Sequence, residues 1–215
     1  MIKAIILAGG RGKRLGPITD TIPKVMVRIG GKPLLEYTID LLRQNGIKEI
    51  ILLVGYLSSV IQVYFIDGKK FGVNISYHEE NSSRLLGTAG AVGRLRKEIK
   101  DTFLVLYGDI LRELDIKSLL NFHKRKKGLA TICVYKNCNT NPKSIVTFDK
   151  NERIKSFAER PQSVIQRSVW SNASLYVLEP EIFAYVPKDG PSDFGKDVFP
   201  KVLKEGQKIY AHKQE

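Results

Sequence analysis

The first half of the chain alternates short apolar runs with amphipathic helical patterns, and this alternation constrains the fold more than any other feature. Residues 33–46 carry apolar side chains at intervals of three and four, which predicts a helix with one face on a sheet. Further helices are predicted at 58–66 and 88–99, and strands at 2–8, 25–29, 50–54, 73–77 and 103–107. Strands separated by crossover helices predict an α/β fold with a doubly wound, mostly parallel sheet.

After about residue 128 the pattern changes to strands joined by turns. Strands are predicted at 130–135, 144–149, 154–158 and 170–178, with short helical pieces near Pro180 and Asp193. This half is expected to form a mixed-sheet lid beside the parallel sheet. With 215 residues, 43% of them hydrophobic, the chain can bury one sizeable core. We therefore expect a single domain over residues 1–215, with halves at 1–128 and 129–215.

The composition narrows the class of partner without selecting one. A formal net charge of +13 favours polyanions, and nucleic acid, an anionic membrane and a triphosphate all fit. No basic stripe interleaved with aromatic residues supports nucleic-acid binding, which remains the third-ranked hypothesis. No run of eighteen apolar residues exists, so we expect a cytoplasmic protein that binds no membrane.

A glycine-rich loop follows the first predicted strand. Its glycines are Gly9, Gly10 and Gly12, and its cations are Arg11, Lys13 and Arg14. Glycines let backbone amides approach a phosphate closely, and the cations add positive charge beside them. The P-loop pattern fails because Leu7 stands where its first glycine belongs, and the dinucleotide fingerprint fails because Leu15 replaces its third glycine. A tight turn without ligand is the alternative for a glycine loop taken alone.

Two further charged residues lie where strands end or loops turn. Lys24 follows Pro23 in a short loop and can reach phosphates as a mobile point charge, although an ordinary surface lysine is the alternative. Asp109 follows Gly108 at the end of the predicted strand 103–107. A carboxylate there can bind a divalent ion near phosphates, with a helix N-cap as the alternative.

Together these segments resemble the sugar-1-phosphate nucleotidyltransferases over nearly the whole chain. The motifs that carry the resemblance are LAGGRGKRLGPIT, TIPKVMVRIGGKPLLEY, LLGTAGAV, LYGDI, FAERP, NASLYVL and KDVFP. The chain is most similar to the short members that make GDP-mannose or GDP-heptose type products. The resemblance implies a Rossmann-like sheet with a sugar-side lid and no left-handed β-helix domain.

The resemblance also implies a role for individual residues. It implies a nucleotide-binding set of Leu7, Ala8, Gly9, Gly10, Gly12, Gly87 and Thr88, a catalytic set of Arg14, Lys24 and Asp109, and a sugar-phosphate set of Glu159, Arg160 and Asn172. It further implies that Asp109 binds Mg²⁺, the expected cofactor. The implied substrates are a nucleoside triphosphate and a sugar 1-phosphate, whose oxygen attacks the α-phosphorus in line without a protein nucleophile. The segment GTAGA favours GTP, and homo-oligomerisation stays open.

The sequence departs from the family pattern in three places. Arg160 replaces the usual lysine, and Ser144 and Ser174 stand where glycines are general. Relatives continue into a segment with a second magnesium carboxylate, which the sequence does not reach before Glu215. A catalytically weak nucleotide-sugar-binding or regulatory module is therefore the alternative function, and an incompletely represented chain explains the same difference.

Overall fold

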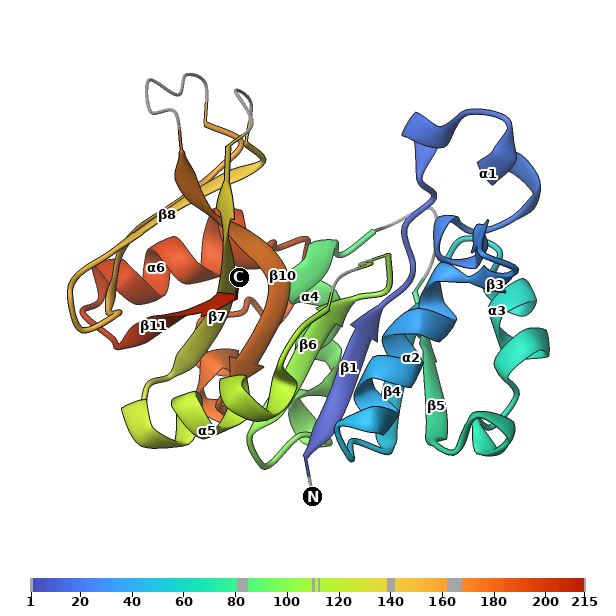
Figure 1. Cartoon of the computed structure of the whole chain (residues 1–215), viewed down its shortest axis with the longest axis horizontal. Helices are drawn as coiled ribbons and strands as arrows, with labels where there is room; N and C mark the ends of the chain where they lie inside the picture. Colours follow the sequence, from blue (N-terminus) through green and yellow to red (C-terminus); the bar gives the residue numbers. More distant parts are fainter. Residues whose placement is uncertain are drawn as a thin grey trace. The chain divides into compact units, whose positions relative to one another are not determined.

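The computed structural model (Figure 1) describes residues 2–80, 85–109, 111, 113–138, 142–161 and 168–214, and it describes Lys13 without its side chain. The predicted cation of Lys13 and the terminal Glu215 therefore lie outside the description. The chain divides into two compact units, Met1–Leu86 with Phe103–Leu114, and Gly87–Thr102 with Asp115–Glu215. We call them unit 1 and unit 2 and describe each by itself. The single domain with halves meeting at residue 128 stays a prediction.

Unit 1 is built on a four-stranded parallel sheet in the order β6-β1-β4-β5 (Figure 1). The strands are β1 (Lys3–Leu7), β4 (Glu49–Val54), β5 (Asn74–Glu79) and β6 (Phe103–Tyr107). Ile5 pairs with Ile51 on one side and with Val105 on the other, and all three are buried. Such apolar strands are typical of a parallel sheet covered on both faces. The strands predicted at 2–8, 50–54, 73–77 and 103–107 are confirmed.

The helices of unit 1 connect these strands. They are α1 (Ile18–Thr21), α2 (Leu34–Gln44) and α3 (Ser58–Phe65), with 3-10 turns η1 (Lys13–Leu15), η2 (Lys24–Met26) and η3 (Lys69–Phe71). Leu35, Ile39 and Leu42 of α2 are fully buried, as the spacing of three and four requires. Pro33 is the N-cap of α2, not its first helical residue as the sequence suggested.

The order of the strands creates a switch point between β1 and β6. The chain passes from β1 to β4 and β5 on one side and then returns to β6 on the other. In open α/β sheets, ligands bind beyond the carboxyl ends of the strands at such a point. The glycine loop follows β1 and Asp109 follows β6, so both lie at the position where the topology favours a ligand.

Unit 2 contains a mixed sheet and a separate hairpin. β7 (Ala130–Asn137) pairs antiparallel with β10 (Val169–Leu178) and parallel with β11 (Ile209–Gln214), while β8 (Ser144–Phe148) and β9 (Ile154–Glu159) pair antiparallel. Its helical segments are α4 (Gly87–Gly93), η4 (Arg94–Lys97), α5 (Ile116–Lys126), η5 (Pro180–Ala184), the π-helix η6 (Phe194–Val198) and α6 (Phe199–Lys204). The predicted mixed sheet is confirmed.

Two local predictions are wrong for identifiable reasons. Residues 25–29 form η2 followed by the short β2 (Arg28–Ile29), which pairs with β3 (Lys32–Pro33) across a turn of two glycines with positive φ. Two such residues suit the tight hairpin turn, which leaves no room for a longer strand. The predicted helix 88–99 is divided into α4 and η4 after Gly93, because glycine is a weak helix former at the position where the two segments meet.

Among the described residues, no helix is long and apolar enough to cross a membrane.

Candidate active site

The glycine loop of unit 1 begins in a tightly packed space at Gly9. The carbonyl oxygen of Gly9 accepts a hydrogen bond from the Tyr56 amide at 3.3 Å. A Cβ at Gly9 would lie 3.2 Å from Oε2 of Glu80 and 3.4 Å from the Gly55 nitrogen. At Gly10, in contrast, nothing lies within 4 Å of an added Cβ. The loop is therefore packed at Gly9 and open at Gly10, where a phosphate could approach the backbone.

Gly12 is shaped by contact with Lys24. Its φ is +72°, and a Cβ added there would lie 2.7 Å from Cβ of Lys24. The Gly12 carbonyl accepts hydrogen bonds from the Leu15 amide at 2.9 Å and from Oγ1 of buried Thr19 at 3.3 Å. Only glycine combines this backbone conformation with this close approach. The loop and the Lys24 side chain are thus packed as one arrangement.

Lys24 and Asp109 form an ion pair at the carboxyl end of the sheet. Their side chains are 31% and 27% exposed, so both charges are accessible from solvent. Gly108, which precedes Asp109, packs closely on the core, since a Cβ there would lie 3.2 Å from side-chain carbons of Ile6 and Leu35. Lys24 and Asp109 are 85 residues apart in sequence, and their pairing brings a cation and a carboxylate to the edge of the glycine loop.

Arg11 and Arg14, the other loop cations whose side chains the structure describes, lie apart from this ion pair. Arg11 donates to Oδ1 of Asp20 at 3.4 Å, and its guanidinium carbon lies 5.2 Å from the ring centre of Tyr56. Arg14 is exposed in η1. Within the described part of the chain, no hydrogen bond or ion pair joins Arg14 to Lys24 or Asp109. The structure therefore brings Gly12, Lys24 and Asp109 together and leaves Arg14 at the surface.

The carboxylate of Asp109 could contribute to a Mg²⁺ site. Among the described residues, no group of three or more His, Cys, Asp or Glu side chains could hold a metal ion. Mg²⁺ keeps several waters and takes one or two carboxylates together with substrate phosphates, instead of a cage made by the protein alone. A single accessible carboxylate beside the glycine loop fits an ion that arrives with its phosphates.

In unit 2, the start of α4 is tied to the residue before η6. Gly87 has a φ of +71°, and an added Cβ would lie 2.6 Å from the carbonyl oxygen of Ser192. That oxygen accepts hydrogen bonds from the amides of Ala89 at 2.8 Å and Gly90 at 3.0 Å. These first amides of a helix have no partner inside the helix, so the Ser192 carbonyl satisfies them. Glycine at position 87 is required by this close approach.

A second set of hydrogen bonds centres on Thr88. Its amide and its hydroxyl donate to Oδ1 of Asp193 at 3.2 and 3.1 Å. The same hydroxyl accepts from the Phe194 amide at 3.0 Å. We call the group of Thr88, Asp193 and Phe194 the threonine clasp. It joins α4 to η6, although 105 residues separate Thr88 from Asp193.

Glu159 lies at the end of β9 against the π-helix η6. A Cβ added at Gly195 would lie 2.7 Å from Oε2 of Glu159 and 2.9 Å from the ring of Phe157. Glycine therefore makes the space that the carboxylate occupies. Burial raises the pKa of Glu159, while the positive charge of Arg160 opposes the shift and the Asp193 carboxylate adds to it.

The other two predicted sugar-side residues differ in their surroundings. Arg160 is exposed, has a φ of +50°, and its amide donates to the Lys143 carbonyl at 2.8 Å. Asn172 uses its side chain locally, because Nδ2 donates to the Tyr176 hydroxyl at 2.7 Å and Oδ1 accepts from the Ser174 amide at 2.8 Å. Asn172 thus stabilises an irregularity in β10, and the role implied by the resemblance stays a prediction.

Ser144 and Ser174, which depart from the family pattern, have structural roles. Ser174 has a φ of +60°, the conformation that favours the glycine usual in relatives, and the Asn172 side chain supports it. Oγ of Ser144 accepts from the Asn172 amide at 2.9 Å, and its carbonyl accepts from Ser171 Oγ at 2.7 Å. A hydroxyl at position 144 therefore attaches β8 to β10.

Two residues of this region, Asp193 and Gly195, have contacts that their local sequence does not predict. Asp193 precedes a helix, so its local pattern suggests an N-cap, yet its side chain bonds to the distant Thr88. Gly195 lies inside a helix, where glycine would be unfavourable, and its close approach to Glu159 supplies the reason. The glycine at position 195, inside a predicted helical piece, was the one sequence signal that could have indicated this close contact.

Comparison with known proteins shows which proteins this chain resembles in sequence. A family model described as Nucleotidyl transferase matches residues 3–215. A UTP–glucose-1-phosphate uridylyltransferase of Synechocystis is 37% identical over 98% of the chain, and a mannose-1-phosphate guanylyltransferase of Mycobacterium tuberculosis is 30% identical over 98%. The chain spans 57% and 58% of the lengths of these two relatives.

Solved structures have the same fold. HddC from Yersinia pseudotuberculosis, in complex with GMP-PN, superposes with a TM-score of 0.82 at 27% identity, covering 100% of this chain and 91% of that one. A Bacillus anthracis protein in complex with sucrose gives a TM-score of 0.88 at 22% identity, covering 100% of this chain and 87% of that one, and shows the fold alone. The expected α/β fold with a mostly parallel sheet is confirmed.

Proposed function

Because the chain belongs to the nucleotidyl transferase family, we propose that it transfers a nucleotidyl group from a nucleoside triphosphate to a sugar 1-phosphate. The products are a nucleoside diphosphate sugar and pyrophosphate. The observation that carries the proposal is the packing of Gly12 on Lys24 and the ion pair of Lys24 with Asp109 at the switch point of the sheet. A glycine loop, a mobile cation and a carboxylate together suit phosphoryl chemistry better than any one of them alone.

In this proposal the loop from Leu7 to Gly12 holds the triphosphate through its backbone amides. Gly10 leaves open space at the backbone for a phosphate oxygen. Lys24 and exposed Arg14 neutralise charge on the transferring and leaving phosphates, which is the main contribution a protein makes to phosphoryl transfer. The sugar-phosphate oxygen is already anionic, so the attack on the α-phosphorus needs no protein base. This agrees with histidines that lie outside the predicted motifs.

We assign Mg²⁺ binding to Asp109. The ion would neutralise phosphate charge and orient the triphosphate for in-line attack. In the structure the Asp109 carboxylate accepts from Lys24 instead. We expect Lys24 to turn from Asp109 toward the phosphates when substrate binds, since the accessible lysine side chain has several rotatable bonds.

On the sugar side we propose that Glu159 accepts hydrogen bonds from sugar hydroxyls and that Arg160 binds the sugar phosphate. Exposure and a fixed planar fork of donors suit Arg160 to a phosphate. Gly87 and Thr88 are proposed to support the nucleotide, with α4 held by the threonine clasp. Asn172 acts through the shape of β10, because its own side chain is engaged.

For the base we propose guanine. The segment GTAGA resembles guanylyltransferases, the Mycobacterium tuberculosis relative is one, and HddC was solved with GMP-PN. Uridylyl transfer to glucose 1-phosphate is the second candidate, because the Synechocystis relative with that name is 37% identical. Both candidates use the same phosphate machinery and differ only in base and sugar.

The test is a matrix of nucleoside triphosphates against hexose and heptose 1-phosphates, with pyrophosphate release as the readout. We expect turnover with GTP and a sugar 1-phosphate in the presence of Mg²⁺, and none in excess chelator. Turnover only with UTP and glucose 1-phosphate would show that the base is uracil and that the proposal of guanine is wrong. Tight triphosphate binding without pyrophosphate release from any pair would contradict transfer and favour a binding or regulatory module.

A further inference from the structure

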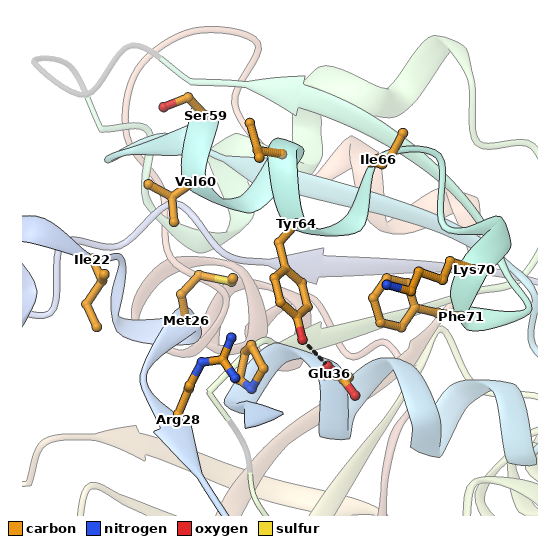
Figure 2. Close-up of a pocket in the computed structure, with 12 residues that line it drawn as sticks. Ile22, Met26, Arg28, Glu36, Ser59, Val60, Tyr64, Ile66, Lys70 and Phe71 are labelled. Atoms are coloured by element: carbon orange, nitrogen blue, oxygen red, sulfur yellow. Dashed lines mark hydrogen bonds between the residues drawn. The ribbon is translucent and has the colours of Figure 1, made fainter. Parts of the chain in front are cut away.

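A cleft separate from the glycine loop opens in unit 1 between α3 and the segment that carries η2, β2 and the start of α2. Its volume is about 870 Å³, within the usual range of small-molecule sites, which is roughly 300–1,000 Å³. Figure 2 shows Tyr64 in the middle, pointing from α3 toward Glu36, with Met26 and Arg28 on one side and Phe71 and Lys70 on the other. None of these residues belongs to the proposed catalytic set.

The floor of the cleft is aromatic. Tyr64 and Phe71 lie with ring centres 5.8 Å apart and planes inclined by 28°, and both line the cleft. The Tyr64 hydroxyl donates to Oε2 of Glu36 at 2.8 Å. This hydrogen bond fixes the orientation of the ring, and it also raises the pKa of Tyr64. A planar apolar group has a fixed surface on which to stack.

Two large apolar side chains on the rim of the cleft are exposed to solvent. Val63 is 78% exposed and Ile66 is 67% exposed, and both line the cleft. Ile66 also has a φ of +52°, which is rare and strained for a β-branched residue. The Tyr77 hydroxyl donates to the Ile66 carbonyl at 2.6 Å and stabilises this conformation. Retained strain at such a position is a common mark of a binding surface.

Cationic groups supply the polar part of the lining. Arg28 donates from Nη1 to the Gly31 carbonyl at 2.7 Å, and its guanidinium carbon lies 5.9 Å from the Tyr64 ring centre. Its other N–H groups can bind an anion. Lys70 is exposed on the opposite side of Tyr64. Glu36 is the one carboxylate among the lining residues, and the Tyr64 hydroxyl already donates to it.

We propose that this cleft binds a small aromatic anion, a planar apolar ring system bearing a carboxylate, sulfonate or phosphate group. The ring would lie on Tyr64 and Phe71 and under the apolar rim, and the anionic group would bind Arg28. Two cations against one engaged carboxylate favour an anion over a cation or a neutral molecule.

Met26 connects the cleft to the proposed phosphate lysine. It is 7% exposed, lines the cleft, and lies in the same 3-10 turn as Lys24. A ligand that contacts Met26 can therefore shift η2 and change triphosphate affinity, and by reciprocity the triphosphate would change affinity for the ligand. This coupling rests on the proposed function, whereas binding in the cleft does not.

The chain offers an unusually clean probe for binding. It contains two methionines, Met1 and Met26, so carbon-13 labelling of methionine methyl groups gives two signals. Met26→Leu removes and thereby assigns the cleft signal. We expect anilinonaphthalene sulfonate to shift the Met26 signal with saturation at one equivalent. Phenylnaphthylamine, the same ring system without the sulfonate, should bind more weakly by on the order of tenfold.

Charge variants test the assigned position of the anion. Arg28→Gln should weaken binding of the sulfonate by on the order of tenfold, and Glu36→Gln should strengthen it by a smaller factor. Arg43→Gln is the matched control, since it removes a cation of α2 that does not line the cleft. Equal binding of the two probes, or equal weakening by Arg28→Gln and Arg43→Gln, would overturn the proposal.

A second copy of the chain is the competing occupant. If the cleft instead served a dimer, light scattering would give twice the monomer mass, Val63→Lys would restore the monomer mass, and the sulfonate would leave Met26 unshifted. That set of results would overturn the proposal. If the sulfonate changes triphosphate affinity in the original protein but not in Arg28→Gln, the coupling to Lys24 is supported. If it changes the affinity in neither protein, the coupling is wrong, while the proposed binding of the anion in the cleft is unaffected.

Discussion

Two regions of the molecule carry the proposed chemistry, and they are built in different ways. In unit 1, Lys24 and Asp109 are partly exposed charges whose positions depend on glycines at the ends of strands. In unit 2, Thr88 and Asp193 are fixed by a closed set of hydrogen bonds, and the Glu159 carboxylate fits into a space left by Gly195.

The difference follows from what each region has to do. Charges that exchange one partner for a phosphate must stay accessible and contribute little to stability, because an exposed ion pair is worth only about 0–1 kcal/mol. A scaffold that holds groups in position requires satisfied buried hydrogen bonds, and removing one partner costs about 1–3 kcal/mol. We therefore expect changes in unit 1 to reduce activity and changes in unit 2 to reduce stability.

The largest effect is expected for Asp109→Asn. The change keeps the shape of the side chain but removes the charge that binds Mg²⁺ and pairs with Lys24. We expect kcat/KM to fall by at least ~100-fold, or about 3 kcal/mol of transition-state stabilisation. The free energy of unfolding should change by less than about 1 kcal/mol. Pyrophosphate release and urea unfolding measure the two quantities, and a large stability loss with retained activity would reverse the comparison.

Gly12→Ala should combine both kinds of loss. A Cβ at a φ of +72° is strained, and it would lie 2.7 Å from Cβ of Lys24. We expect a stability loss of about 1–2 kcal/mol and displacement of Lys24. Gly10→Ala is the control, because nothing lies within 4 Å of its added Cβ and its stability should be nearly unchanged. Equal unfolding midpoints for the two variants would show that the loop does not pack on Lys24.

Thr88→Val tests the threonine clasp. It preserves the side-chain shape but leaves the Phe194 amide and the Asp193 carboxylate without the hydroxyl. We expect a stability loss of about 1 kcal/mol. Thr88→Ser keeps the hydroxyl and should recover most of the loss. Unfolding in urea provides the measurement, and a Thr88→Val protein as stable as its serine counterpart would remove the clasp from the account.

The smallest effect concerns pH and His212. Burial lowers the pKa of His212 from its ordinary value of 6.5, with the Asp115 carboxylate opposing and the Arg125 charge reinforcing the shift. The unfolded chain therefore takes up this proton more readily than the folded protein. Stability should be unaffected well above pH 6.5 and should fall as the pH drops below it. The free energy of unfolding in urea should be measured above and below pH 6.5. In His212→Gln its decrease at low pH should be smaller than in the original protein, and an unchanged decrease would assign the effect to other groups.

The sequence predicted unit 1 better than the clasp, for a physical reason. Gly12, Lys24 and Asp109 are each visible from local patterns, since a glycine loop and strand ends have their own signals. The pairing of Thr88 with Asp193 depends on two segments that meet only in the folded chain. The same limit applies to the aromatic cleft, whose residues come from several separate elements. Residues 25–29 were misassigned because two positive-φ glycines shortened the strand.

The most direct test of the central claim identifies the products. Phosphorus NMR of the protein with GTP, Mg²⁺ and mannose 1-phosphate, or another sugar 1-phosphate that turns over, should show equal formation of pyrophosphate and a new diphosphate-linked sugar. Lys24→Ala should slow both signals by the same factor, because one site produces both. Release of inorganic phosphate, pyrophosphate without a diphosphate sugar, or full turnover in Lys24→Ala would contradict the proposed transfer at the Gly12, Lys24 and Asp109 site.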